Sequence, residues 1–118
     1  MNKESLEVRE ALEGYYKVEE KDKTVWYQPD GQIGRKYGPA IEGDDGYKQW
    51  WVDGKRHRLD GPALEWADGT KEWWVDGKRH REDGPAVEWA DGTKEWFVDG
   101  KRLTEEEFNQ RVVKGIVS

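Results

Sequence analysis

Two histidines, His57 and His80, are the residues whose type and spacing could do acid–base or metal chemistry. They lie 23 residues apart in nearly identical segments, each within the sequence Lys-Arg-His-Arg. The chain has no cysteine, neither histidine belongs to a His-x-x-x-His pair, and the third equivalent position holds Leu103. We therefore expect both imidazoles to serve the fold, and we expect no metal and no cofactor.

Carboxylates are a second candidate, because two of them side by side can form an acid–base pair. A two-residue turn at Asp68-Gly69 would set Glu65 opposite Glu72, with Arg81 beside Glu72 to neutralise it. The same arrangement recurs in the next unit, and such repetition is typical of a structural salt-bridge row. The only serines lie near the chain ends, which does not favour a serine nucleophile. The sequence therefore favours a protein that is not an enzyme.

Aromatic residues opposite arginines form the third candidate, and their chemistry would be binding. Each of three units places one aromatic ring opposite one arginine, so the pairs should form a row. The rings can stack on the arginines within the protein, or they can receive a partner's side chain, a base or a sugar. Both alternatives remain open. The candidate binding surface consists of Trp51, Arg56, Trp74, Arg79, Phe97, Arg102, Glu72 and Arg81.

A repeat must position these side chains. Gly-Pro-Ala recurs with a spacing of 23 residues, which defines the units 38–60, 61–83 and 84–106. The last two units share 18 of 23 positions. A more divergent unit, 15–37, precedes them, in which Val18-Glu19 matches Ile41-Glu42 and Tyr27 matches Trp50. We therefore predict four tandem units over residues 15–106.

Each unit has the pattern of β-structure. Asp-Gly is the strongest short hairpin signal, because a type I′ turn needs positive φ at both central residues. Unit 61–83 contains two such signals, Asp68-Gly69 and Asp76-Gly77. Gly-Pro at each unit start and the internal glycines disfavour a helix. The strands expected in this unit are 62–67, 70–75 and 78–81.

Two-residue turns also determine which side chains share a face of the array. Trp73 would face Leu64 across the first turn and His80 across the second. The predicted core face carries Leu64, Trp66, Trp73, Val75 and His80. The predicted charged face carries Ala63, Glu65, Glu72, Trp74, Arg79 and Arg81.

The two ends of the chain depart from the repeat, and a repeat array needs such ends to cover its terminal edges. Residues 1–14 contain SLEVREALEG, which is typical of a short amphipathic helix. Thr104 and Glu107 form a capping box, and Phe108, Val112 and Val113 follow at helical spacing. We predict a C-terminal capping helix over 107–118. The whole chain, 1–118, is then one mainly β repeat domain with a short helix at each end.

Composition is consistent with a thin, aromatic core. Only 34% of the 118 residues are hydrophobic, but eight Trp, five Tyr and two Phe can bury large areas. The formal net charge is -6, with bases interleaved among acids, so duplex DNA binding is not expected. The sequence shows no signal core and no apolar run of membrane length, so we expect a cytoplasmic protein without membrane contact.

The stretch from Trp51 to His57, WVDGKRH, followed by Asp68-Gly69 on a 23-residue period, resembles the MORN repeat, a β-hairpin unit of that length. The resemblance covers residues 15–106. It departs at Arg58, where MORN units usually have glycine. The motif His-Arg-x-Asp-Gly-Pro-Ala, followed by the C-terminal sequence Leu-Thr-Glu-Glu-Glu-Phe, is similar to motifs in uncharacterised repeat proteins of bacteriophages and bacteria. The resemblance implies a scaffold or contact surface.

These observations favour a non-enzymatic protein-binding repeat module, and the resemblance suggests a phage protein that occupies or inhibits a host defence protein. A nucleic-acid role stays open in two forms, an acidic DNA mimic or a single-strand binder that uses the tryptophan row. Carbohydrate binding is a further alternative, because indole rings suit sugars. On the predicted faces, Trp74→Ala should weaken partner binding, whereas Trp73→Ala should destabilise the fold.

Overall fold

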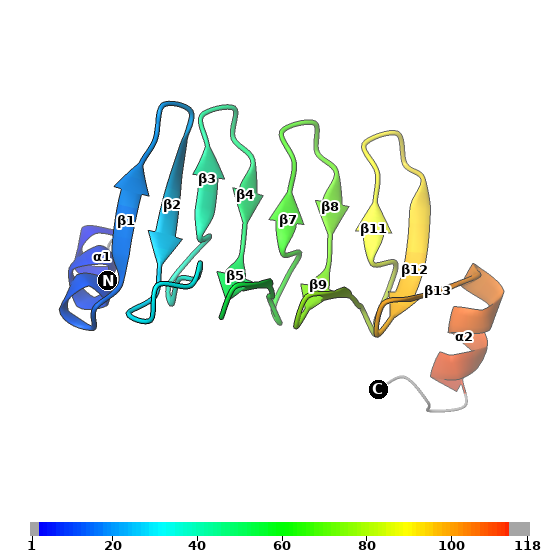
Figure 1. Cartoon of the computed structure of the whole chain (residues 1–118). Helices are drawn as coiled ribbons and strands as arrows, with labels where there is room; N and C mark the ends of the chain where they lie inside the picture. The colour runs from blue at the N-terminus through cyan, green and yellow to red at the C-terminus, as the bar shows by residue number, and fades with distance from the viewer. Residues whose placement is uncertain (1–2, 114–118) are drawn as a thin grey trace.

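A row of antiparallel β-hairpins with a helix at each end forms the molecule, as Figure 1 shows. The structure is a computed structural model that describes the backbone of residues 3–113 and the side chains of residues 6–111. The predicted fold class is confirmed. The parts of the two predicted helices that fall on residues 1–2 and 114–118 lie outside the described residues.

Nine strands form one antiparallel sheet in the order β1-β2-β3-β4-β7-β8-β11-β12-β13. Their bounds are β1 Tyr16–Glu19, β2 Lys23–Tyr27, β3 Ile41–Gly43, β4 Lys48–Gln49, β7 Leu64–Glu65, β8 Lys71–Glu72, β11 Val87–Glu88, β12 Lys94–Val98 and β13 Lys101–Leu103. Two further ribbons pair β5 with β6 and β9 with β10. Their bounds are β5 Trp51–Val52, β6 Lys55–Arg56, β9 Trp74–Val75 and β10 Lys78–Arg79.

Each of the last three units therefore contributes two hairpins, whereas the first unit contributes β1–β2 and a lower loop closed by the single bridge between Tyr27 and Ile33. We call β1–β2, β3–β4, β7–β8 and β11–β12 the upper hairpins, and β5–β6, β9–β10 and β12–β13 the lower hairpins. The lower hairpins lie at the base of the upright sheet (Figure 1). Backbone hydrogen bonds join neighbouring lower hairpins: the Arg58 N–H donates to the Trp74 carbonyl at 3.0 Å, and the Gly77 N–H donates to the Arg56 carbonyl at 2.9 Å. Neighbouring units thus hold each other at both levels.

The lower turns have the predicted geometry. Asp76 has a φ of 50° and Gly77 a φ of 80°, the two positive values that a type I′ turn requires. The flanking pairs are Val75 with Lys78 and Trp74 with Arg79. The predicted register across Asp76-Gly77 is confirmed.

The predicted register of the upper turns is wrong by one residue. Leu64 pairs with Glu72, and the Trp66 N–H donates to the Thr70 carbonyl at 2.9 Å. The loop is therefore the three residues 67–69, with Gly69 at a φ of 94°. A type I turn followed by a left-handed glycine is the usual form of a three-residue hairpin loop, and Asp-Gly fits it as well as it fits a two-residue turn.

A slip of one residue moves every side chain of a strand to the other face. Leu64 and Trp66 consequently share a face with Glu72 and Trp74, not with Trp73 as predicted. We call this face the front face and the opposite one the back face. Aliphatic and acidic or amide side chains alternate in register across the front face: Ile41, Gln49, Leu64, Glu72, Val87 and Glu95.

The same slip changes the charge pattern of the back face. Glu65 pairs with Lys71, not with Glu72 as predicted. Acids and bases then alternate across the sheet as Glu42, Lys48, Glu65, Lys71, Glu88 and Lys94. Opposite charges directly across a strand pair are favourable. The back face therefore carries a balanced ladder rather than a row of carboxylates.

The core is thin and follows the Gly-Pro-Ala segments. Ala63, predicted on the charged face, is fully buried, and its backbone joins two units: its carbonyl accepts from the Trp50 N–H, and its own N–H donates to the Glu72 carbonyl. Leu64 is buried beside it on the front face. Trp66, predicted in the core, is instead exposed. Its place in the predicted core followed from the wrong turn length.

The first unit differs from the alignment expected for it. The Trp26 N–H donates to the Ala40 carbonyl just as the Trp50 N–H donates to the Ala63 carbonyl, so Trp26, not Tyr27, is the equivalent of Trp50. The upper turn of this unit is tighter: Glu19 pairs with Thr24, whereas Glu42 pairs with Lys48. The lower turn is longer by one residue, so the 23-residue period resumes at Arg35.

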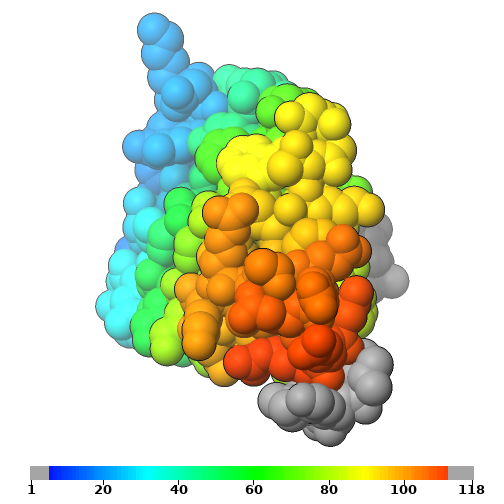
Figure 2. Space-filling model, turned by 90° about the vertical axis from the view of Figure 1, so that its right-hand side faces the viewer, coloured from blue at the N-terminus to red at the C-terminus, as the bar shows by residue number. Residues whose placement is uncertain are grey.

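Helices cover the two ends of the array. α1 spans Lys3–Leu12 and α2 spans Glu105–Val113. Figure 2, which faces the C-terminal end, shows α2 over the lower part of the last unit, with the β11–β12 turn standing clear above it. Phe108 of α2 is buried against Leu103, together with Trp96. Within the described part of the chain, neither helix has the length and apolar character needed to cross a membrane.

The predicted capping box of α2 is confirmed. The Thr104 N–H donates to the Glu107 carboxylate at 2.9 Å, and the Glu107 N–H donates to the Thr104 hydroxyl at 3.1 Å. The helix therefore begins at Glu105, two residues before the predicted start, because Thr104 is the N-cap.

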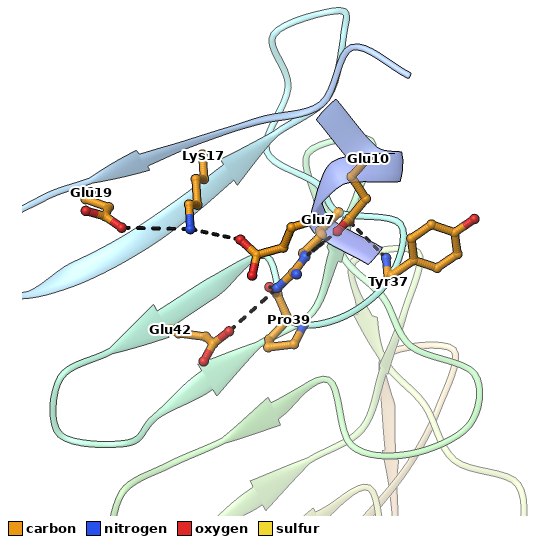
Figure 3. A network of polar contacts seen from close by, with 8 residues as sticks. Glu7, Glu10, Lys17, Glu19, Tyr37, Pro39 and Glu42 are labelled. Carbon is orange, nitrogen blue, oxygen red and sulfur yellow. Dashed lines mark hydrogen bonds and ion pairs between the residues drawn. The ribbon is translucent and has the colours of Figure 1, made fainter. Parts of the chain in front are cut away.

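A buried ion pair fixes α1 to the first unit (Figure 3). The carboxylate of Glu10, fully buried, accepts from Arg35 Nε at 3.1 Å and from the Tyr37 N–H at 3.1 Å. In the next unit, Arg58 at the position equivalent to Arg35 donates to Asp60, its neighbour two residues on. Tyr37 occupies that neighbour position in the first unit. The helix thus supplies the carboxylate that the first unit lacks.

Candidate functional site

Aromatic rings and guanidinium groups alternate along the lower hairpins on the front face. Arg56 lies 5.4 Å from the Trp51 ring and 5.1 Å from the Trp74 ring. Arg79 lies 5.3 Å from the Trp74 ring and 5.3 Å from the Phe97 ring. We call this row, from Trp51 to Phe97, the Trp–Arg ladder. The type I′ turns create it, because they set each ring opposite an arginine and the units repeat the pair.

A buried carboxylate lies behind the ladder. Glu72 is 5% exposed and accepts from Trp66 Nε1 at 2.7 Å and from Trp74 Nε1 at 3.1 Å. Arg79 adds an ion pair at 3.2 Å. Four hydrogen bonds therefore satisfy one carboxylate, which links the upper hairpin to the lower one. This is the arrangement that makes a buried charge tolerable.

The units on either side repeat this arrangement in part. Glu95 accepts from Trp89 Nε1 and lies 3.6 Å from Arg102. Gln49 occupies the same place in the second unit and accepts from Trp51 Nε1 at 2.9 Å. An amide carries no charge to pair with an arginine. Among the described side chains, Arg56 Nε is the buried polar atom left without a hydrogen-bond partner.

Most of the candidate binding residues lie together. Trp51, Arg56, Trp74, Arg79 and Phe97 form the ladder, with Glu72 behind it. Phe97 is 8% exposed, so it packs within the core more than it faces solvent. Arg102 lies at the open end of the row and is largely exposed.

Arg81 is the predicted site residue that the structure separates from the others. It stacks on the Trp73 ring at 3.8 Å and pairs with Asp83 and Glu88 on the back face. The prediction that Arg81 lies beside Glu72 is wrong, because the chain turns away into the Gly-Pro-Ala segment after His80. Arg58 makes the equivalent stack on Trp50, so this arginine belongs to the construction of each unit.

The two exposed tryptophans of the front face, Trp66 and Trp89, were not among the predicted site residues. They are 40% and 41% exposed and follow β7 and β11 at the start of the upper turns. Tyr47 lies in the same row, with its ring 6.3 Å from the Trp66 ring. A three-residue upper loop, with Gly69 in the left-handed conformation, pairs Leu64 with Glu72 and sets Trp66 on the same face. The sequence could therefore have predicted the position of these rings, because Asp-Gly also suits such a loop.

Both histidines hold the turn of the next unit. The His57 ring accepts the Asp76 N–H at Nδ1 at 3.0 Å, and the His80 ring accepts the Asp99 N–H at 2.9 Å. These bonds agree with the structural role predicted for them. Within the described part of the chain, no group of three or more His, Cys, Asp or Glu residues is placed to hold a metal ion.

The first unit achieves the same contact with a different residue. The Gln28 side chain accepts the Asp53 N–H and donates to the Asp53 carboxylate at 2.9 Å. Gly34 stands at the position of His57, and a Cβ there would come within 2.0 Å of the Gln28 amide oxygen. The absence of a side chain at Gly34 therefore leaves room for the amide that replaces the imidazole.

Backbone hydrogen bonds fix the charge of the upper-turn aspartates. The Thr70 N–H donates to Asp68 at 2.8 Å and holds the pKa of that carboxyl below its usual value of 3.8. The Thr93 N–H does the same for Asp91. Both groups are acceptors of a bond that only the ionised form makes fully, so they remain negatively charged near neutral pH.

The fold and the front face together define an array of β-hairpin repeats with a ring-lined surface. No protein-family model, curated protein or solved structure matches this chain.

Proposed function

We propose that this chain is a non-enzymatic protein-binding repeat module whose front face contacts a protein partner. The observation that supports this best is the pair of half-exposed indoles, Trp66 and Trp89, on one face of the array. Tryptophan is among the residues that most often dominate the binding energy of protein interfaces.

The two indoles are also held in place before any partner arrives. Each directs its N–H to a carboxylate behind it, Trp66 to Glu72 and Trp89 to Glu95. Side chains that are already ordered lose little entropy on binding, which increases the affinity that a given contact provides. The Trp–Arg ladder lies below this surface, and the exposed Arg102 lies at the open end of the ladder.

The resemblance to repeat proteins of bacteriophages and bacteria suggests what kind of partner this chain has. We propose that the chain is a phage protein and that its partner is a host defence protein in the cytoplasm, which it occupies or inhibits. The formal charge of -6 makes partners with basic surfaces the more favourable ones.

The nucleic-acid alternatives have less support. The acidic DNA mimic needs continuous negative charge, whereas the back-face row alternates Glu and Lys across each strand pair. A single-strand binder needs a basic groove beside its stacking rings. The side chains around the rings of Trp66 and Trp89 are instead acidic at Asp45, Asp68 and Glu72.

Affinity purification tests the proposal. The immobilised chain is exposed to lysate of the host bacterium, and the retained proteins are identified by mass spectrometry. We expect a specific protein that the Trp66→Ala/Trp89→Ala double variant fails to retain. Loss of two interface tryptophans should weaken binding by roughly 4 kcal/mol or more.

The matched control is Leu59→Ser, which removes an exposed apolar side chain that lies away from the front face. This variant should retain the partner as the wild type does. Thermal melting of both variants checks that they are folded. Retention of the same protein by the double tryptophan variant, or no specific retention by the wild type, would contradict the proposal. Retention of single-stranded DNA or of oligosaccharide in place of protein would favour the alternatives.

A further inference from the structure

A hollow of about 410 Å³ separates the two exposed indoles on the front face. Its lining consists of Asp45, Trp66, Ala67, Asp68, Thr70, Glu72 and Trp89. Two aromatic rings and three carboxylates thus surround it, and among the described lining residues none is a lysine or an arginine. The hollow is therefore both aromatic and negatively charged, which is the combination that attracts an organic cation.

The molecule itself shows which cation fits between its rings. In the Trp–Arg ladder below, the gap between Trp51 and Trp74 holds the guanidinium of Arg56, and the gap between Trp74 and Phe97 holds that of Arg79. In the upper row, the Tyr47 and Trp66 rings approach each other directly, whereas the gap between Trp66 and Trp89 is the hollow. The upper row thus also places two aromatic rings on either side of a gap, and the described residues that line this gap include no arginine.

We propose that the hollow between Trp66 and Trp89 receives an arginine side chain of the protein partner. This inference rests on the proposed function and names the chemistry of the partner at that site. A planar guanidinium stacks on an indole face and at the same time directs its N–H groups in the plane to carboxylates. Asp45 and Asp68, one from each of two neighbouring upper turns, supply those carboxylates at the hollow.

Glu72, at the inner end of the hollow, is not available to pair with the partner's guanidinium. Glu72 already accepts two indole N–H groups and pairs with Arg79. Asp45 and Asp68 differ from Glu72, because both are exposed and each accepts a backbone N–H of its own turn at one oxygen, without an arginine or lysine partner among the ion pairs of the described residues. The partner's guanidinium should therefore bind between the rings with its N–H groups toward these two aspartates.

A peptide titration tests this without knowledge of the partner. The full chain carries ¹⁵N in its tryptophans, and variants Trp66→Phe and Trp89→Phe assign the two indole N–H signals. The probe is acetyl-Gly-Arg-Gly-amide. Its uncharged control contains citrulline, which has the same shape as arginine but no charge, and a second control contains lysine. We expect the arginine peptide to shift both signals with saturation, lysine to bind less well, and citrulline to leave them unchanged.

Charge variants locate the site. Asp45→Asn/Asp68→Asn retains the side-chain oxygens that the turns need and removes the two charges, so it should weaken the arginine peptide about three- to tenfold. Asp60→Asn/Asp91→Asn removes the same charge from residues that do not line the hollow and should leave the dissociation constant unchanged. Melting temperatures verify the fold of each.

Three outcomes would overturn the arginine site: no saturable shift at Trp66 and Trp89, equal binding of the citrulline peptide, or equal weakening by the two double variants. Lysine binding as tight as arginine would reject the choice of arginine. None of these results bears on the protein-binding proposal, which the affinity purification tests. The arginine site and the protein-binding proposal can therefore fail separately.

Discussion

Gln49 shows at the scale of one residue how much a single charge matters in this array. It stands where the next unit has Glu72, and both accept an indole N–H from the lower hairpin. Only the glutamate also pairs with an arginine. The Arg56 guanidinium is consequently buried in part without a partner for its Nε, which costs free energy.

Gln49→Glu should therefore stabilise the protein. The new carboxylate would keep the bond from Trp51 Nε1 and offer Arg56 the ion pair that Glu72 gives to Arg79. A hydrogen bond to a charged group contributes about 1.5–3 kcal/mol, from which the burial of the added charge must be subtracted. We expect the free energy of unfolding in urea to rise by roughly 1 kcal/mol.

The reverse change, Glu72→Gln, is the matched control. It places an uncharged amide in the third unit, as at Gln49, where Trp66, Trp74 and Arg79 all donate to the carboxylate, and it should lower the free energy of unfolding by about 1.5–3 kcal/mol. If both variants destabilise the protein by the same amount, the Gln49 position does not need a charge and the argument from Arg56 is wrong.

At the scale of elements, a buried carboxylate attaches α1 to the array. Glu10 reaches Arg35 and the Tyr37 N–H from a fully buried position. Removing one partner of a buried ion pair leaves the other charge uncompensated, which costs about 3–5 kcal/mol. Glu10→Ala should lower the free energy of unfolding by that amount, measured by urea titration.

Tyr37→Asp offers a rescue that only this geometry predicts. Asp60 and Asp83 pair with Arg58 and Arg81 from the position that Tyr37 occupies in the first unit. In the Glu10→Ala background, Tyr37→Asp should restore part of the lost stability, because it gives Arg35 a local carboxylate. In the wild type it should have little effect or destabilise. Equal effects in both backgrounds would show that the two sites are independent.

The N-terminus of α2 should make stability depend on pH in the acidic range. The Thr104 N–H, as the largest cause, holds the pKa of the Glu107 carboxyl below its ordinary value of 4.5. A depressed pKa in the folded state adds stability that is complete above the ordinary value and is lost as the pH falls through the folded value. Glu107→Gln should therefore melt below the wild type at pH 7, and the difference should shrink as the pH falls below 4.5 and through the lowered pKa of the folded state. A melting difference that stays constant over this acidic range would contradict this.

The whole molecule is a one-dimensional array, so its length should be adjustable. Each junction between the lower hairpins uses the same backbone bonds, for example from the Arg58 N–H to Trp74 and from the Arg81 N–H to Phe97. Stability in such arrays is approximately a sum over units and over the contacts between neighbours. A second copy of residues 61–83 inserted after Asp83 creates the same sequence junctions that exist at Gly61 and Gly84.

We expect the lengthened chain to fold and to melt at a higher temperature than the wild type, because it adds one unit and one junction. It also places a second Trp66 beside the first and so doubles the proposed arginine sites. Calorimetry should give the melting temperature, and the peptide titration should give twice the number of bound peptides. A lower melting temperature would show that the present units are not interchangeable.

The sequence by itself determined the last three units, their lower turns and the presence of a helix at each end. Their signals are local: the Gly-Pro-Ala period, positive φ at Asp76-Gly77, and the capping box of Thr104 and Glu107. Each depends only on the conformational preferences of a few adjacent residues.

Only the tertiary structure decided the faces of the upper hairpins, because Asp-Gly suits loops of two and of three residues and the choice flips every side chain. It thereby set Trp66 and Trp89 outside and Glu72 inside, where Trp74 and Arg79 satisfy the carboxylate. The tertiary structure also decided the roles of Glu10 and Gln28. Glu10 gives the first unit the carboxylate that Asp60 gives the second, and Gln28 accepts the turn N–H that the His57 imidazole accepts in the second unit. Contacts between residues far apart in sequence made these choices, since the free energy of burying and pairing each group depends on neighbours that the local sequence does not contain.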